Sequence, residues 1–279
     1  MLSYRHAFHA GNFADVLKHS VLIYVLDYMA RKDKGYSYID THSGAGMYAL
    51  QDDYAQKTGE YKDGIGKLYQ SSDLPEILNE YISLISSLNN NKSLEIYPGS
   101  PGIAKELLRR QDFAHLFELH KSDFELLEEL CQRWKKSRVY KSDGYNGLLE
   151  QLPPPTRRGV VLMDPPFELK EDYVKSVKTI IQAYRKFSTG TYLLWYPVVK
   201  RSYIEAMEEQ FVSSNVRNVI QLEYCQKQDS DEYGMTGTGL FIVNPPWQLL
   251  GESDNLLTTM KEKLGNKHSS YTARQLIDE

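Results

Sequence analysis

The sequence has little cysteine, no long apolar run and no strong excess of charge of either sign. Its two cysteines, Cys131 and Cys225, lie far apart and outside any CxxC spacing. This usage argues against a disulfide framework or a structural zinc site and fits a reducing compartment. No segment approaches the roughly 20 apolar residues of a membrane-spanning helix, and the amino-terminal residues lack the apolar stretch of a signal peptide. We therefore expect a soluble, cytoplasmic protein with no membrane partner.

Charge gives no global sign of nucleic-acid binding, because the formal net charge is −4 and the pI is near 6.0. Any contact with RNA or DNA must come from a local basic surface. The 279 residues are 41% apolar, which is enough for a complete core. This length suits one large domain with an insertion.

Strand-like and amphipathic segments alternate from residue 36 onward, which is typical of an α/β fold with a mostly parallel sheet. A short polar segment joins the last two strands, so the final strand is predicted to be antiparallel. A parallel sheet closed by such a hairpin is the topology of a Rossmann-like class I methyltransferase, here seven-stranded. The strands are expected at 36–40, 114–118, 138–141, 160–163, 191–196, 219–224 and 239–244.

The first two predicted strands are separated by residues 41–113, which is far more than an ordinary crossover needs. Apolar residues repeat at helical spacing between Leu74 and Leu88, with Pro75 suited to a first turn. A small helical subdomain is therefore predicted within this stretch. The expected boundaries are 47–95 for the inserted subdomain, and 1–46 with 96–279 for the methyltransferase domain.

The tetrapeptide Asp164-Pro165-Pro166-Phe167 directly follows an apolar run and suits methylation of an exocyclic amino group. The lone pair of adenine N6 is delocalised into the ring, so acceptors that draw on the amino protons favour attack on a methyl donor. Asp164 and the Pro165 carbonyl, in a segment of restricted dihedrals, are predicted to be those acceptors. Phe167 is predicted to stack on the base. The simpler alternative is a strand end and a turn.

A small-residue turn, Gly44-Ala45-Gly46, follows the first strand and would let the backbone approach a nucleotide-like cofactor. Glu118, at the tip of the second strand, is predicted to accept hydrogen bonds from ribose hydroxyls. Asp143 is predicted to accept from the adenine amino group of the cofactor, with Gly144 leaving room for the ring. Ser100 lies near the same cleft, although a helix N-cap is the simpler interpretation. S-adenosylmethionine explains these residues together with Asp164.

The same glycines match a loose dinucleotide fingerprint, so a nicotinamide-dependent oxidoreductase is the main rival. That function leaves Asp164 without a role and needs a ribose-binding acid about 20 residues after the glycines. Asp52 and Asp53 lie in this window but fall in the predicted insertion.

A second tetrapeptide of the same type, Asn244-Pro245-Pro246-Trp247, follows the last predicted strand. Ligands of open α/β sheets bind at the carboxyl ends of the parallel strands. An antiparallel strand delivers its own carboxyl end to the opposite edge, so Asn244 is predicted to point away from the cofactor. The tetrapeptide is interpreted as a structural strand exit with a packed Trp.

Segments spread over nearly the whole chain resemble the bacterial 23S rRNA adenine-N6 methyltransferase J family. The resemblance implies a Rossmann-like methyltransferase with a helical insertion, S-adenosylmethionine as donor and one adenine of 23S ribosomal RNA as acceptor. Phe167 stands where the family commonly has Tyr, which keeps the stacking face and loses a hydroxyl. The segments include Met1–His6, Asp40-Thr41-His42, Tyr97–Pro101, Leu193–Pro197, Gly234-Met235-Thr236 and Asn244–Trp247.

The resemblance also implies residue roles. Asp164 would accept the amino proton, and Tyr4 would lie in a substrate-facing tail. The implied cofactor contacts are His19, His42, Ser100, Glu118, Asp143, Gly144 and Asp164.

A helix is predicted from Asn12 to Arg31, with Asn12 as its N-cap. Lys18 and His19 are interpreted as a cofactor-facing pair on this helix. For Lys18 the alternative is a solvated face, unless the RNA phosphate runs there. No metal is expected at the amino-terminal histidines, because transfer from a sulfonium requires none.

Adenine N6 is hidden inside a duplex, so the target base must be single-stranded or flipped into the pocket. Basic residues that flank the expected active-site loops are candidate phosphate contacts. They are Arg5, Lys18, Arg157, Arg158, Lys170, Lys200 and Arg201. Two further alternatives remain at this stage: a DNA adenine or protein-glutamine methyltransferase, and a ribosome-assembly factor with a vestigial site. A monomer is expected.

Overall fold

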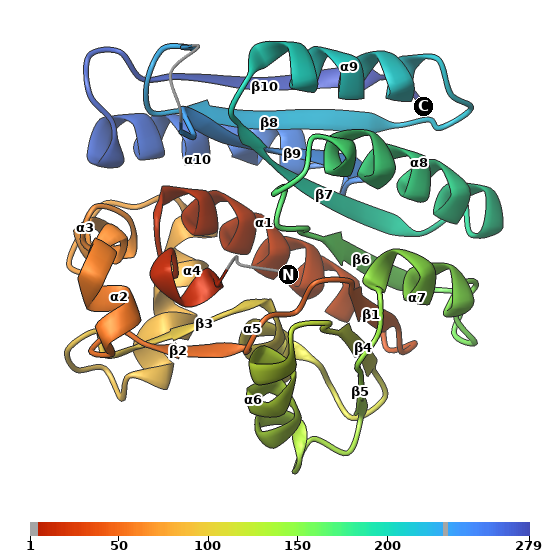
Figure 1. Ribbon diagram of the computed structural model, residues 1–279, viewed down its shortest axis with the longest axis horizontal. Helices are drawn as coiled ribbons and strands as arrows, with labels where there is room; N and C mark the ends of the chain where they lie inside the picture. The colour runs from red at the N-terminus through yellow and green to blue at the C-terminus, as the bar shows by residue number, and fades with distance from the viewer. Residues whose placement is uncertain (1–4, 231–233) are drawn as a thin grey trace.

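The computed structural model describes residues 5–230 and 234–279 and shows an α/β protein with one large sheet (Figure 1). Its helices are η1 (His6–Phe8), α1 (Phe13–Ala30), α2 (Asp53–Thr58), η2 (Glu60–Lys62), α3 (Ile65–Leu68), α4 (Glu76–Leu88), α5 (Ser100–Leu107), α6 (Lys121–Cys131), α7 (Gly144–Glu150), α8 (Glu171–Lys186), α9 (Arg201–Val212) and α10 (Leu249–Leu264). Its strands are β1 (Ser37–Asp40), β2 (Met47–Ala49), β3 (Ile96–Pro98), β4 (Phe113–Phe117), β5 (Ser137–Tyr140), β6 (Gly159–Met163), β7 (Thr191–Val198), β8 (Val219–Cys225), β9 (Gly237–Val243) and β10 (Ser270–Ile277).

The strand order of the large sheet is β10-β8-β9-β7-β6-β1-β4-β5. Strands β5, β4, β1, β6 and β7 pair in parallel, whereas β9 is antiparallel to both β7 and β8. The seven predicted strands and the antiparallel final strand of the hairpin are confirmed. The predicted total of seven is wrong, because β10 adds an eighth strand antiparallel to β8. Most residues of β10 are exposed, so its sequence lacks the apolar alternation that predicts a strand.

The sheet separates two apolar cores, because successive side chains of a strand point to opposite faces. Leu162 of β6 and Leu193 of β7 belong to the core that includes α1, α4 and α10. Their neighbours Val161 and Leu194 belong to the core that includes α7, α8 and α9. The three helices that follow β5, β6 and β7 therefore share one face of the sheet.

Helix α1 begins where the sequence predicts, because the Asn12 side chain accepts hydrogen bonds from the main-chain N–H groups of Ala14 and Asp15. The helix is buried on nearly all sides, and its buried residues include the polar Asp15, Lys18 and His19. A helix in such surroundings carries polar side chains inward only where they have partners. Lys18 and His19 line a pocket at the carboxyl ends of the parallel strands, and Asp15 forms an ion pair with Lys18.

Residues 47–95 contain α2, η2, α3 and α4, and strand β2 pairs with β3 to close the segment. Helix α4 has Pro75 at its N-cap position and is followed by Asn90 and Asn91, whose φ angles are positive. Tyr81 of this segment is fully buried in the same core as α1. The division of the chain into two domains remains a prediction.

The second tetrapeptide lies away from the carboxyl ends of the parallel strands, as predicted. The Asn244 amide donates hydrogen bonds to the carbonyls of Ser188 and Gly190, 2.8 Å each, beside the amino end of β7. Trp247, in contrast, is 78% exposed, so the prediction of a packed Trp is wrong. Over the described ranges, no helix is both long and apolar enough to cross a membrane.

Candidate active site

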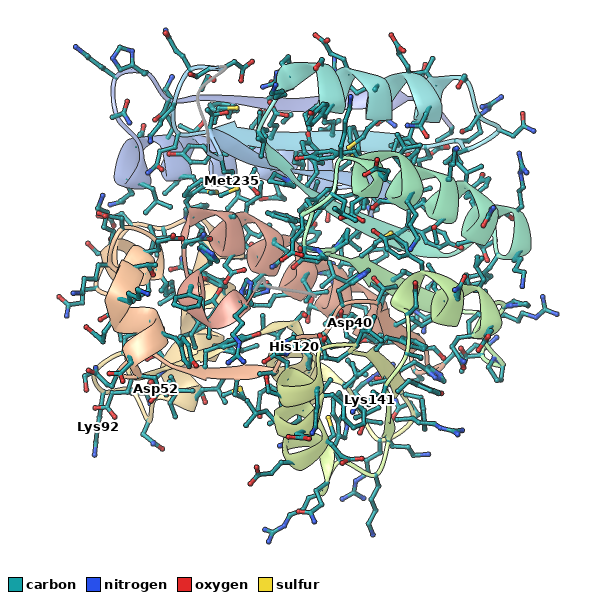
Figure 2. All side chains as sticks on the ribbon, in the orientation of Figure 1. Asp40, Asp52, Lys92, His120, Lys141 and Met235 are labelled. Carbon is teal, nitrogen blue, oxygen red and sulfur yellow. The ribbon has the colours of Figure 1, made fainter. Side chains whose placement is uncertain are left out.

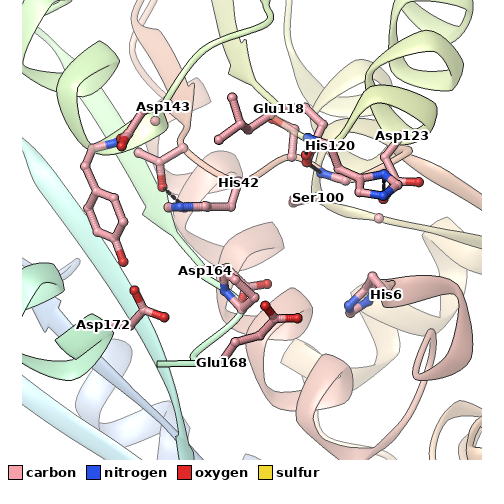
Figure 3. A pocket seen from close by; sticks show the side chains of 18 of the residues that line it. His6, His42, Ser100, Glu118, His120, Asp123, Asp143, Asp164, Glu168 and Asp172 are labelled. Carbon is pink, nitrogen blue, oxygen red and sulfur yellow. Dashed lines mark hydrogen bonds and ion pairs between the residues drawn. The ribbon is translucent and has the colours of Figure 1, made fainter. Parts of the chain in front are cut away.

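One pocket lies at the carboxyl ends of β1, β4, β5 and β6, where the loops after these strands meet (Figure 3). Figure 3 shows Asp143, His42, Glu118 and Ser100 along one side of the hollow and Asp164 across from them. The pocket is lined by all seven residues predicted to contact the cofactor, and by Lys18. They are His19, His42, Ser100, Glu118, Asp143, Gly144 and Asp164.

Asp164 follows β6, and its side chain is 16% exposed. The Lys18 ammonium donates to its Oδ2 at 2.6 Å and also lies 2.9 Å from Asp15 Oδ1. Burial alone would lower the pKa of Lys18, but Asp15 and Asp164 outweigh it and raise that pKa above its ordinary value. Lys18 therefore stays charged and fixes one oxygen of Asp164. The solvated-face interpretation of Lys18 is wrong, because the residue is 3% exposed.

Asp15 does not line the pocket but pairs with Lys18 behind it, a contact that the sequence did not reveal. Its Oδ2 accepts from the Gly11 N–H at 2.8 Å and lies 2.9 Å from His6 Nε2. Burial would raise the pKa of Asp15, but the charges of His6 and Lys18 hold it well below the usual range. The i, i+3 spacing of Asp15 and Lys18 was the available signal, yet this spacing usually marks a weak surface pair. Here the pair is buried behind Asp164.

Glu118, one residue after β4, stabilises the glycine turn (Gly44-Ala45-Gly46) by a hydrogen bond. Its two carboxylate oxygens accept hydrogen bonds from the N–H groups of Gly44 at 2.8 Å and His120 at 2.6 Å. Burial raises the pKa of Glu118 above its ordinary value. Gly44 and Gly46 have φ angles of 59° and 81°, a region that side-chain-bearing residues rarely adopt.

Asp143 is the N-cap of α7, and its Oδ1 accepts from the N–H groups of Tyr145 and Asn146. Gly144 is also required for a reason that the sequence did not reveal. A Cβ at this position would lie 1.8 Å from the Thr41 carbonyl oxygen, so close packing of α7 on the loop after β1 demands glycine. Lys175 of α8 lies 3.4 Å from Asp143 Oδ2 and was not foreseen as a pocket residue.

Two pocket histidines are neutral at physiological pH. Burial lowers the pKa of His42 to about 4, and its Nδ1 lies 2.8 Å from the Thr41 hydroxyl. Burial lowers the pKa of His19 to about 3, and its Nδ1 lies 2.8 Å from the Tyr97 hydroxyl. The imidazoles of His19 and His42 therefore add no positive charge to the pocket.

Ser100 is the first residue of α5, and Gly99 is the N-cap, so the N-cap interpretation of Ser100 is wrong. Asp40, at the end of β1, is fully buried, and burial raises its pKa to about 6. The Tyr38 hydroxyl donates to Asp40 Oδ2 at 2.8 Å, and hydrogen bonds from Ser100 and the His42 main chain also lower the pKa of Asp40 against the effect of burial.

The other predicted residues of the Asp164 tetrapeptide do not line the pocket. Pro166, rather than Pro165 or Phe167, lines it. The Phe167 ring packs against Tyr173 and Trp195, with centroids 4.6 and 5.8 Å away, and its φ angle is 48°. Such a conformation is costly for an aromatic residue and is typical of functional sites. Tyr4 lies outside the described residues.

Two candidate phosphate contacts have other partners. The Arg158 guanidinium donates to the carbonyls of Lys34 and Met29, after and within the end of α1. Arg201 donates to Glu223 and Asp229, at 3.0 and 2.8 Å. These hypotheses are not supported, because both side chains are already engaged with acceptors.

The dinucleotide alternative lacks its ribose-binding acid. Asp52 is the N-cap residue of α2, is exposed and does not line the pocket. Figure 2 shows it near Lys92, at the outer end of the inserted segment and well away from Asp40. In the portion of the chain that is described, no group of three or more His, Cys, Asp or Glu side chains is placed to hold a metal.

The strand order, the antiparallel β9 and a pocket with Asp164 beside the glycine turn define a class I methyltransferase. The family model described as ribosomal RNA large subunit methyltransferase D, RlmJ, matches residues 33–277. The chain belongs to this family.

Relatives support this membership over nearly the whole length. The chain is 46% identical over 275 residues to ribosomal RNA large subunit methyltransferase J of Escherichia coli, covering 98% of each chain. It is 46% identical over 265 residues to the protein of the same name from Haemophilus influenzae, covering 95% of this chain and 94% of the relative. The crystal structure of a Legionella pneumophila protein, 40% identical, superposes with a TM-score of 0.89 and covers 96% of this chain and 98% of that one.

Proposed function

We propose that the protein transfers a methyl group from S-adenosylmethionine to the N6 amino group of one adenine in 23S rRNA. The proposed roles of the residues rest on the position of Asp164, which lies at the pocket and accepts a hydrogen bond from Lys18 at one carboxylate oxygen. The names of the relatives supply the class of acceptor, large-subunit ribosomal RNA.

The donor binds along the loops after β1, β4 and β5. The glycine turn lets the donor approach the main chain closely, and Glu118 accepts hydrogen bonds from the ribose hydroxyls of the donor. Ser100, His19 and His42 line the remaining walls. Bound S-adenosylmethionine supplies an activated methyl group, so no metal is needed.

Asp164 and the Pro165 carbonyl accept the two amino N–H groups of the target adenine. This draws the N6 lone pair out of the ring, so a nitrogen–methyl bond forms while the sulfur–methyl bond breaks and its electrons return to sulfur. One N6 proton then leaves through Asp164. Lys18 acts as a positioning residue, because its charge holds Oδ2 and leaves Oδ1 to face the base.

The target base enters the pocket in a flipped or single-stranded form, and Phe167 provides a stacking surface for it at the rim. The contacts of Phe167 with Tyr173 and Trp195 support a fixed ring. Tyr4 is proposed to contact the substrate. We further propose that the protein acts as a cytoplasmic monomer and that 47–95 form a subdomain inserted between 1–46 and 96–279.

The test is transfer of a labelled methyl group to 23S rRNA that lacks modifications, followed by nucleoside analysis. Wild-type protein should form N6-methyladenosine. Asp164→Ala should lower kcat by roughly 10²- to 10³-fold, as loss of one preorganised hydrogen-bonding group does in other enzymes.

The matched control is Asn244→Ala, which changes the same position of the second tetrapeptide at the far edge of the sheet. Its kcat should remain close to that of the wild type. An Asp164→Ala protein as active as the wild type would refute the role of Asp164, and a product other than N6-methyladenosine would refute the reaction.

A further inference from the structure

A second groove lies between α7 and α8, which run on the same face of the sheet (Figure 1). Its lining includes Asn146 of α7 and Lys178 of α8. Tyr145 and Lys175 line both this groove and the active-site pocket. The groove therefore adjoins the pocket at these two residues.

The groove is basic, although the whole chain has a net charge of −4. Its charged lining residues are Lys170, Lys175, Lys178 and one acid, Glu171. Lys170 lies 5.3 Å from the centroid of the Tyr203 ring. Among the residues that the structure describes, neither Lys170 nor Lys178 forms an ion pair with a carboxylate. Their charges are available to an anionic ligand.

The pocket rim next to the groove has the opposite charge. Glu168 and Asp172 line the pocket on the side of α8, and Glu118, Asp123 and Asp143 line it elsewhere. Carboxylates at this density repel a phosphodiester chain. When a base of a nucleic acid occupies the pocket, the electrostatic energy of its phosphodiester backbone is therefore most favourable along the lysine side of α8.

We propose that the groove between α7 and α8 binds the sugar-phosphate backbone of the rRNA beside the flipped adenine. This inference rests on the proposed function and adds the path of the RNA backbone over the protein surface. Lys170 and Lys178 neutralise phosphates, and Asn146 and Gln182 hydrogen-bond to phosphate or ribose oxygens. Such contacts do not depend on sequence and help offset the energy of unstacking the base.

The experiment measures methylation of unmodified 23S rRNA by Lys178→Gln and by the double variant Lys170→Gln/Lys178→Gln. The control is Lys263→Gln, an equal charge change at an exposed position of α10, a helix of the other core. The KM for RNA should rise several-fold in the single variant and further in the double variant. The dissociation constant for S-adenosylmethionine, measured by calorimetry, should not change.

Salt dependence separates a phosphate contact from a general loss of structure. Each lost contact should reduce the slope of log(kcat/KM) against log salt by about 0.7 for a single strand or about 0.9 for a duplex. Variants with the KM and slope of the control would overturn the inference while leaving the methyltransferase function intact. A defect seen only on protein-containing ribosomal particles, and not on naked RNA, would also overturn it, because the partner would then be a protein. Failure of the wild type to methylate would instead refute the proposed function.

Discussion

His19 is a buried base that the fold keeps neutral. It is 1% exposed, and its ring stacks on Tyr97 with centroids 5.7 Å apart. Its pKa falls to about 3 because of burial, whereas an unfolded chain titrates near 6.5. At a pH between these two pKa values, the His19 imidazole is protonated in the unfolded state and neutral in the native state. Acid therefore destabilises the protein through this residue, and no such effect arises above the unfolded pKa.

We predict that His19→Gln removes part of the acid sensitivity of folding. The free energy of unfolding of the wild type, minus that of the variant, should fall by about 1.4 kcal/mol per pH unit as the pH drops from about 6 to 4. Urea denaturation at several pH values measures this difference. His268→Gln, at an exposed position, controls for removal of a histidine from the surface. Parallel stability curves for the wild type and His19→Gln would contradict the prediction.

Lys18 shows where inference from residue type fails at this scale. A lysine on a predicted helix is usually solvated, since removing its charge from water is costly. Two carboxylates from different parts of the chain, Asp15 and Asp164, remove that cost here. The position of Asp164 at the pocket was predicted from its local Pro-Pro context, and its role in the reaction stays a prediction.

Helix α7 illustrates how one element fixes the pocket. Its Asp143 cap and the contact of Gly144 with Thr41 join the ends of β5 and β1. We predict that Gly144→Ala lowers the free energy of unfolding by about 1–3 kcal/mol, the usual cost of overpacking. The same variant should weaken binding of S-adenosylmethionine, because the pocket wall must shift.

Gly251→Ala is the matched control in α10, where an added Cβ meets nothing within 4 Å. It should raise the free energy of unfolding by up to about 1 kcal/mol, because alanine favours helix over glycine. Guanidinium denaturation measures both variants. Equal effects of the two substitutions would show that the close approach at Gly144 is not restrictive.

Elements with strong local signals were predicted well, and elements that depend on pairing were not. Helix α1 has an N-cap, and the parallel strands are apolar runs, so both are visible in the sequence. Strands β2 and β3 have three residues each, and β10 is largely exposed. Their strand character comes from hydrogen bonds to distant partners rather than from their own side chains.

At the scale of the whole molecule, the pocket joins loops from both halves of the chain. A ligand that binds only the native state at about 100 times its Kd stabilises the protein by about 2.7 kcal/mol. We predict stabilisation of this size by S-adenosylmethionine and none by NAD. Thermal or chemical unfolding with each ligand measures the difference. Stabilisation by NAD and not by S-adenosylmethionine would contradict the prediction and support the oxidoreductase interpretation.

The sequence by itself determined the α/β class, the positions of the main strands along the chain, the Asp164 tetrapeptide after one of them and the glycine turn after another. These features depend on local periodicity and on neighbouring residues, which the chain order preserves. Only the tertiary structure decided that Lys18 and Asp15 are buried behind Asp164, that Gly144 packs on Thr41, that β10 completes the sheet and that Trp247 is exposed. Each of these depends on which distant segments come into contact, and the physical reason is that burial and pairing energies belong to the assembled fold rather than to any one segment.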